Sequence, residues 1–283
     1  MIAAYAKRSS IRLIVLVLAL SWLPWFVLSQ LDVDDPASHP LYLIGGFGPL
    51  LAAVLCRWVD RRDPVEWHNP WLGRKSVSLL LGLPLLFGVV PIAIGGGVAP
   101  LIGGPPLDAA IGRSAIDGLG GVLPFVLITA LAGPVTEEVA WHGYLWPRYR
   151  SFQGRVGASL VLGTLWGLWH LPLFSIDGTT QQAGGGVESL YFFFFMLSGV
   201  LQTYLFAYVY EATGFGVYAA VAMHFFINLT SYFFAFSWQA RSVEMIVLAA
   251  FCVVSWFRLR AFDARIERSG SELIKRAAEQ ASP

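Results

Sequence analysis

The feature that most constrains the fold of this chain is a series of long apolar blocks separated by short links. Eight blocks are long enough to cross a bilayer, since a helical span needs about 20 apolar residues. We expect spans at residues 11–30, 40–59, 77–101, 119–147, 156–176, 187–210, 215–236 and 242–258. The links are rich in Gly, Pro, Asp and Ser, which interrupt helices. The pattern predicts an all-α, polytopic membrane bundle of about eight transmembrane helices.

The composition agrees with this interpretation. Of the 283 residues, 56% are hydrophobic and 13% are charged, whereas a soluble domain has about 25% charged residues. We see no internal repeat and no second domain, so we interpret residues 1–283 as a single integral membrane domain ending in a charged cytoplasmic tail, 259–283. The first apolar run, about 18 residues, exceeds the usual core of a signal peptide, and we expect it to remain a span.

The basic residues predict the orientation of the chain in the membrane. With the N-terminus inside, every one of the 19 Lys and Arg residues except Arg113 and Arg241 falls in an inner segment. Cytoplasmic loops carry such an excess of Lys and Arg, so we expect both termini to be cytoplasmic. The expected location is the plasma membrane of a prokaryote. The net charge of +1 gives no reason to expect a nucleic-acid partner.

Ionisable residues inside spans are candidates for function, because an intramembrane charge costs about 2.5–3.5 kcal/mol on insertion scales. At about 1.5 Å per helical residue, three predicted helices place such residues about 15–22 Å from the inner surface. The common depth predicts one polar site in the inner half of the membrane. The set that we expect there is Glu137, Glu138, His142, His170, His224 and Asn228.

The segment around the two glutamates is predicted to be a broken helix. Pro134 removes a backbone donor and clashes with the preceding turn, so it should kink or end the helix there. Thr136 is a suitable cap for a restarted helix. Adjacent helical residues point about 100° apart, so we expect one glutamate to face a wet cavity and the other to be held by a neighbour, with His142 the nearest. Pro172 should likewise disturb the helix that carries His170.

These residue types favour hydrolysis by an activated water molecule, because no Ser or Cys nucleophile is expected at this depth. A carboxylate can act as a general base, while His224 and Asn228, one helical turn apart, can donate to an oxyanion. A divalent metal such as zinc, bound by His170, His224 and Glu137, is an alternative. The chain lacks the H-E-x-x-H motif of many zinc proteases. The residues alone leave both mechanisms open and require no cofactor.

Three motifs in order resemble those of a known family. "EEVAWHG" resembles E-E-x-x-x-R, "WGLWH" resembles F-x-x-x-H and "HFFIN" resembles H-x-x-x-N. The set is similar to the CPBP family of intramembrane proteases, which includes CAAX prenyl endopeptidases and the bacteriocin-processing or immunity proteins also called Abi. The resemblance covers the motif-bearing core at 119–236 and implies about eight helices around a polar cavity open to the cytosol.

The resemblance also implies roles for single residues. Glu137 would activate water with help from His170, His224 and Asn228 would bind the oxyanion, and Glu138 would support the first glutamate. Two positions depart from the motifs, since His142 stands in place of arginine and Trp166 in place of phenylalanine.

We therefore expect an intramembrane endopeptidase, similar to CAAX prenyl proteases, that acts in the lipid bilayer on a membrane-bound peptide or lipidated protein. Two alternatives remain at this stage. A non-catalytic membrane immunity or interaction protein would use the polar cluster only for helix packing, and the missing arginine favours it. A proton-coupled transporter would use Glu and His as a relay, although the chain lacks the repeats that many transporters show.

Overall fold

The computed structural model describes residues 2–32, 38–60, 77–106, 108–214, 216–234 and 237–281, and every regular element in these ranges is helical. The first half contains α1 (Ile2–Leu28), α2 (Ser38–Gly46), α3 (Gly48–Val59), α4 (Val77–Val98), η1 (Ala99–Ile102), α5 (Ala110–Gly118), α6 (Val122–Ala130), η2 (Leu131–Val135), α7 (Thr136–Glu138) and η3 (Val139–Leu145). The second half contains α8 (Trp146–Trp169), η4 (Leu171–Ser175), α9 (Thr180–Ala183), α10 (Leu190–Ala212), α11 (Val217–Ser231) and α12 (Trp238–Ala281).

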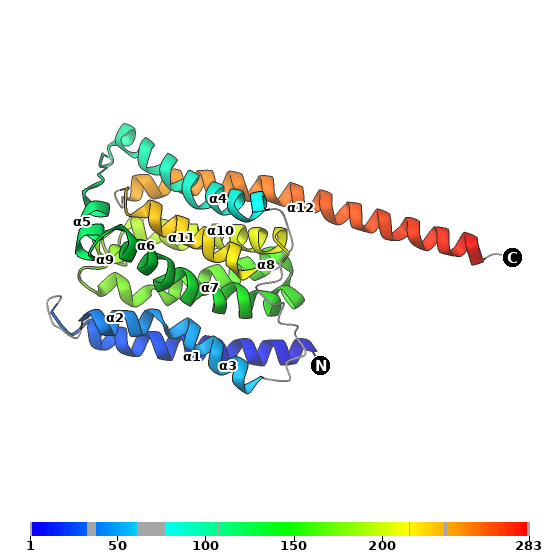
Figure 1. The fold of residues 1–283 in the computed structure, drawn as a ribbon, viewed down its shortest axis with the longest axis horizontal. Helices are drawn as coiled ribbons and strands as arrows, with labels where there is room; N and C mark the ends of the chain where they lie inside the picture. Colours follow the sequence, from blue (N-terminus) through cyan, green and yellow to red (C-terminus); the bar gives the residue numbers. More distant parts are fainter. Residues whose placement is uncertain are drawn as a thin grey trace.

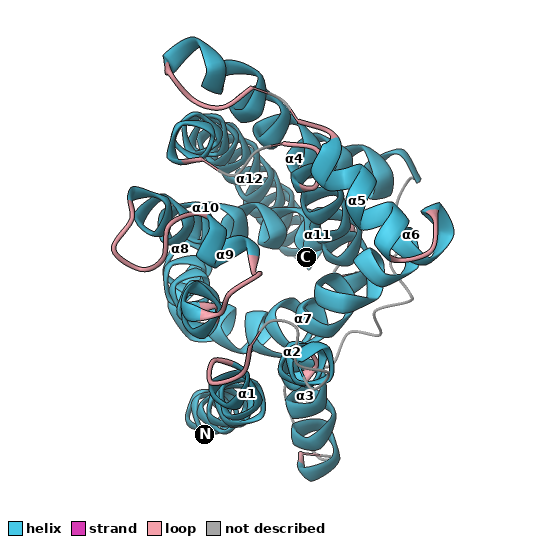
Figure 2. Cartoon of the chain, turned by 90° about the vertical axis from the view of Figure 1, so that its left-hand side faces the viewer, coloured by secondary structure: helices cyan, strands magenta, loops and turns pink. Residues whose placement is uncertain are grey.

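The long helices lie side by side in a bundle. In Figures 1 and 2, α1, α2 and α3 lie at one side, α4 and α12 lie at the opposite side, and α7, α8, α10 and α11 lie between them. Helix α10 packs against α8 and α12, and α4 packs against α11 and α12. The central helices thus carry all three motifs. The prediction of an all-α, polytopic membrane bundle is confirmed.

The number of spans in the described residues is approximate. Five helices are long and apolar enough to cross a membrane, or six if the pair Pro40–Gly46 and Gly48–Val59, bent by 45°, is one span. The predicted spans 119–147 and 156–176 fall in one stretch of 54 residues, Val122–Ser175. A break at Gly154, with φ of 70° and ψ of 177°, separates its two parts. The predicted span 215–236 corresponds to the shorter helix α11.

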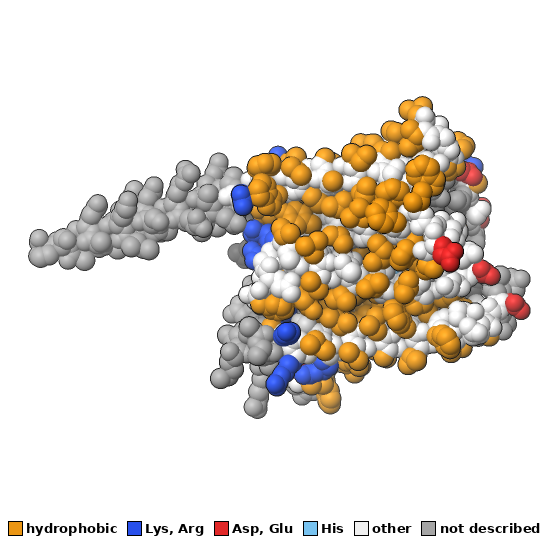
Figure 3. Space-filling model, turned by 180° about the vertical axis from the view of Figure 1, so that it is seen from behind, with side chains coloured by type: hydrophobic (Ala, Val, Ile, Leu, Met, Phe, Trp, Pro, Cys, Tyr) orange, Lys and Arg blue, Asp and Glu red, His pale blue; other side chains and the backbone are white. Residues whose placement is uncertain are grey.

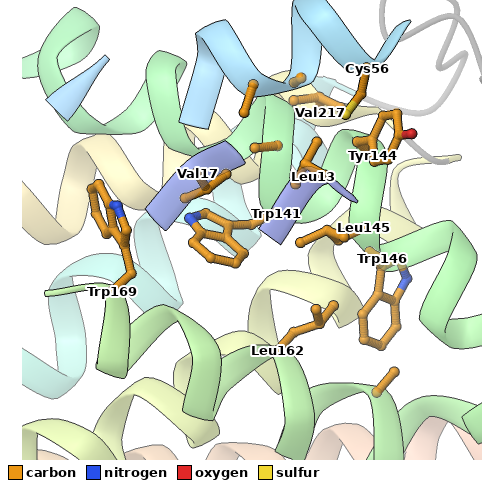
Figure 4. Close-up of a cluster of buried hydrophobic side chains, with 14 of the residues drawn as sticks. Leu13, Val17, Cys56, Trp141, Tyr144, Leu145, Trp146, Leu162, Trp169 and Val217 are labelled. Carbon is orange, nitrogen blue, oxygen red and sulfur yellow. The ribbon is translucent and has the colours of Figure 1, made fainter. Parts of the chain in front are cut away.

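The first core cluster joins the N-terminal helices to the central ones. Figure 4 shows Leu13 and Val17 of α1 close to Trp141 and Leu145 of η3, with Leu162 of α8 on the other side. All five side chains are buried. This packing holds η3, which directly follows the two glutamates, between α1 and α8.

Small residues bring α8 and α10 into close contact. A methyl group at Gly163 would lie 2.5 Å from the α-carbon of Val200, so only glycine fits this crossing. Small residues commonly allow such close packing between membrane helices. The far end of α8 is tied to α1, because the Trp22 indole donates a hydrogen bond to the Trp169 carbonyl at 3.0 Å. These two contacts fix the part of α8 that precedes His170.

The ends of the bundle differ in charge. Figure 3 shows Lys and Arg gathered at the end from which α12 extends, Asp and Glu at the other end, and an apolar band between them. Near the basic end, Arg12 of α1 pairs with Asp60 at 2.8 Å, and Arg155 of α8 pairs with Glu211 of α10 at 2.6 Å. Of the inner basic residues counted in the sequence, Arg61, Arg62, Arg74 and Lys75 lie outside the described residues, and the side chains of the tail are not described beyond residue 260.

Candidate active site

The helix that carries the glutamates is broken directly before them, as predicted. Ala132 has a ψ of 97° and Gly133 has a φ of 114°, after which helical dihedral angles resume. Pro134 therefore occupies the first helical position, where its missing N–H is not needed. The predicted cap was wrong in position. Thr136 lies inside the new helix, where its hydroxyl accepts from the Gly133 N–H and donates to the Gly133 carbonyl, both at 3.1 Å.

Glu138 is held from both sides by imidazoles. Its Oε2 lies 2.5 Å from Nδ1 of His142, one helical turn further along the chain. Its Oε1 lies 2.8 Å from Nδ1 of His224 on α11. All three residues are buried. The contact with His142 was expected. The bond to His224 was not, because the two residues are 86 positions apart in the sequence.

Within the described part of the chain, Glu137 is hydrogen-bonded through one carboxylate oxygen only. Its Oε2 accepts a hydrogen bond from the indole N–H of Trp166 on α8 at 2.6 Å. Its Oε1 lies 3.6 Å from the point where a β-carbon of Gly133 would lie. Asn228 Nδ2 lies 3.1 Å and His224 Nε2 lies 3.9 Å from the same point. Three polar atoms from two segments therefore converge on the space that glycine leaves open, which we call the Gly133 gap.

His170 occupies the position directly after α8. Its Nδ1 donates to the Trp166 carbonyl at 2.8 Å, and η4 begins at the next residue, so Pro172 disturbs this helix as predicted. The ring of Trp166 lies 5.1 Å from that of His170 and 6.0 Å from that of His224. No hydrogen bond joins His170 to Glu137 among the described residues. Trp166 links them instead.

Trp166 and Gly133 are the two site residues that sequence reasoning missed. Trp166 was noted only as an aromatic residue in place of phenylalanine. Its indole N–H was a signal, because an apolar span offers few acceptors for such a donor. Gly133 directly precedes Pro134 in the sequence. Its lack of a side chain matters because α11 brings Asn228 and His224 close to it, and that approach has no signal in the sequence.

Two further buried polar residues also escaped the list of intramembrane candidates. Glu244 of α12 and Gln202 of α10 are buried, and the Gln202 amide donates to Glu244 Oε1 at 3.1 Å. Arg241 donates to both oxygens of Glu244 at 2.8 and 3.0 Å. This set joins α10 to α12 and does not include any of the predicted site residues.

The metal alternative does not fit the observed arrangement. Among the residues that the structure describes, no group of three or more His, Cys, Asp or Glu side chains is placed to hold a metal ion. We therefore derive no catalytic step from a metal.

The fold and this cluster define a polytopic helical membrane protein that buries paired glutamates and histidines between its helices, beside the partly buried carboxamide of Asn228. Comparison with known proteins shows what the chain is similar to. Residues 119–230 match the family described as type II CAAX prenyl endopeptidase Rce1-like. The chain is also 27% identical to the CAAX prenyl protease 2 of Methanococcus maripaludis over 237 residues, which are 81% of this chain and 86% of that protein. Both matches agree with the resemblance to the CPBP family of intramembrane proteases that the three motifs indicate.

Proposed function

We propose that this protein is an intramembrane endopeptidase in which Glu137 activates a water molecule to cleave a peptide bond of a membrane-associated substrate. The observation that carries the proposal is the convergence of Glu137 Oε1, His224 Nε2 and Asn228 Nδ2 on the Gly133 gap. Amide hydrolysis requires a general base for the water and hydrogen-bond donors for the oxyanion, placed around one point.

In the proposed reaction, Glu137 Oε1 takes a proton from the water as its oxygen attacks the carbonyl carbon of the substrate. The carbonyl oxygen becomes an oxyanion and accepts hydrogen bonds from Asn228 Nδ2 and His224 Nε2. The bond between carbon and nitrogen then breaks, and the leaving nitrogen takes the proton from Glu137. We assign His170 to orienting the water, as the family resemblance implies.

Glu138 acts through His224 in this scheme and does not touch the substrate. Its carboxylate binds His224 Nδ1 at 2.8 Å, which turns Nε2 toward the Gly133 gap. A carboxylate that holds one ring nitrogen of a histidine and leaves the other to react has the same role in serine proteases. The negative charge of Glu138 also stabilises a His224 imidazolium, which carries the proton that Nε2 donates.

We propose lipidated peptides as the substrate class. The descriptions of the matched family and of the relative from Methanococcus maripaludis both name CAAX prenyl proteolysis. The apolar band in Figure 3 would lie in the bilayer, where a lipid-anchored peptide can approach the protein. We further propose that the basic end faces the cytoplasm, since basic residues gather on that side of membrane proteins. The predicted opening of the polar cavity would then also face the cytoplasm.

The test is cleavage of a panel of membrane peptides by the purified protein, comprising a farnesylated CAAX peptide, its unmodified form and an unrelated lipidated peptide. We expect Glu137→Gln and His170→Ala to lower kcat by about 100-fold or more, because a general base contributes roughly that much. The matched control is Glu244→Gln, which changes another buried glutamate outside the site. It should keep most of the activity.

Equal cleavage by the wild type and the Glu137→Gln variant would contradict the assigned mechanism. Absence of cleavage of every peptide by the wild type, together with an unchanged cellular phenotype of Glu137→Gln, would favour a non-catalytic membrane partner. Proton-coupled uptake in proteoliposomes that requires Glu137 would favour a transporter.

A further inference from the structure

A small cavity lies beside the pair formed by Glu138 and His142. Its volume is about 10 Å³. Gly133, Glu137 and Asn228 do not line it, so it differs from the Gly133 gap. Its walls come from α7, η3, α8 and α10 and consist of Glu138, Trp141, His142, Leu162, Trp166, Thr203 and Phe206.

Two residues of this wall each have a buried nitrogen without a hydrogen-bond partner among the described residues. His142 is 2% exposed, and its Nδ1 is taken by Glu138. Its Nε2 is buried and makes no hydrogen bond to any described residue. The indole Nε1 of Trp141, whose side chain also lines the cavity, is in the same condition. Buried polar atoms are nearly always hydrogen-bonded to protein or to ordered water, so these two nitrogens point to a polar group inside the cavity.

Size and chemistry identify the occupant. A buried water needs about 10–15 Å³ and two to four polar partners, and the cavity is at the lower limit of that range. Its wall includes His142 and Thr203 of α10, and Thr203 is 4% exposed. A hydroxyl group both donates and accepts. A larger ligand does not fit.

We propose that this cavity binds one water molecule between His142 Nε2 and the Thr203 hydroxyl, and that Thr203 is thereby a positioning residue for His224. The water completes a chain from Thr203 through His142 and Glu138 to His224. Because the second nitrogen of His142 is then also bound, the ring cannot rotate without losing a bond at each end. Glu138 is held more firmly, and with it the direction of His224 Nε2. The second half of this inference rests on the proposed function.

The water is tested without any assay of activity. A structure of the purified protein at a resolution that shows ordered water should have density in the cavity, within hydrogen-bond distance of His142 Nε2. The density should persist in Thr203→Ser and disappear in Thr203→Val, which keeps the shape of the side chain and removes the hydroxyl group. An empty cavity in the wild-type protein would overturn the proposal, even if the enzyme is active.

The positioning role is tested by kinetics. We expect Thr203→Val to lower kcat by about fivefold to tenfold, as for the loss of one net hydrogen bond, with KM within about twofold of the wild-type value. Thr203→Ser should restore kcat. Thr213→Val is a matched control directly after the same helix, because this threonine is buried but its hydroxyl bonds only to backbone carbonyls of the last turn of α10. It should leave kcat unchanged.

Each result decides one part of the inference. Unchanged kcat in Thr203→Val, with its cavity water lost, would refute the positioning role and leave the water site standing. If Thr203→Val does not fold, the density in the wild type and in Thr203→Ser decides the water site, and a kcat of Thr203→Ser below that of Thr213→Val would overturn the role. Full activity of Glu137→Gln would refute the proposed function but not the water.

Discussion

Glu137 and Glu138 are neighbours in the chain but have different surroundings. Glu138 binds an imidazole with each oxygen. Glu137 binds Trp166 with one oxygen and directs the other toward the Gly133 gap. Consecutive helical residues point about 100° apart, so the short helix α7 directs the two carboxylates at different partners. At the scale of single residues, the hydrogen bond from Trp166 therefore decides which oxygen of Glu137 is left for the proposed reaction.

The contribution of this donor can be measured with Trp166→Phe. The ring shape is largely kept, but the N–H that binds Glu137 Oε2 at 2.6 Å is lost. A hydrogen bond to a charged group contributes about 1.5–3 kcal/mol, so we expect kcat to fall by about tenfold or more, with a smaller change in KM. Trp146→Phe is the control, because its buried N–H has no described partner. Equal kcat values for the two variants would contradict the orienting role of Trp166.

At the scale of elements, the important feature is the interruption of one long helical stretch. The break at Ala132 and Gly133 ends the intrahelical ladder at membrane depth, where irregular backbone is tolerated only if it is buried in protein or lines a wet cavity. The wider turns of η2 and η3 flank α7 on both sides, and such π-helical turns are frequent at functional sites. The segment thus places the Glu137 carboxylate and the glycine at position 133 within one turn of a newly started helix.

A side chain at the break should block the site. In Gly133→Ala the new methyl group would lie 3.1 Å from Asn228 Nδ2 and fill the gap. We expect kcat/KM to fall by about 100-fold, since a displacement of about 1 Å at reacting groups has effects of that order. Part of any change comes from backbone strain, because Gly133 has a positive φ, and such strain costs about 1–3 kcal/mol.

The chain offers a matched control for that strain. Gly154 also has a positive φ, of 70°, and a methyl group there would meet no atom within 4 Å. Gly154→Ala should therefore lower the thermal unfolding temperature about as much as Gly133→Ala but retain activity. A Gly133→Ala protein as active as Gly154→Ala would show that the gap is not the reaction site.

At the scale of the whole molecule, charge and packing divide the bundle along its length. Basic residues gather where α12 extends beyond the other helices (Figures 1 and 3). The acidic partners at that end, Asp60 and Glu211, are each paired with arginine. The exposed acidic residues lie mainly at the other end (Figure 3). This asymmetry is the basis for the proposed orientation, with both termini in the cytoplasm.

The orientation can be tested by labelling single cysteines in intact cells with a membrane-impermeant thiol reagent. Cys56 and Cys252 are free thiols and would first be replaced by alanine. Glu188→Cys, in the link before α10, should be labelled from outside, whereas Arg258→Cys, where α12 leaves the bundle, should be labelled only after permeabilisation. Both positions are exposed. The reverse pattern would place the basic end outside and would refute the predicted topology.

Much of the site was predictable because its signals are local. The insertion cost of a charge makes Glu137 and Glu138 conspicuous in an apolar span. Pro134 and Pro172 act on the backbone within one turn, so both helix interruptions were placed correctly. The contact between Glu138 and His142 follows from a spacing of four residues. The cap at Thr136 was misplaced because helical dihedral angles already resume at Pro134, directly after Gly133.

The sequence by itself determined the class of fold, the three helices that carry polar residues, the break before the glutamates and the family motifs. Each depends on hydropathy or backbone preference within a few residues. Only the tertiary structure decided that His224 binds Glu138, that Trp166 binds Glu137, that three atoms meet at Gly133 and that a cavity lies beside His142. The rotation of each helix about its axis decides these contacts, and that rotation is set by packing between segments far apart in the chain, such as the close crossing of α8 and α10 at Gly163.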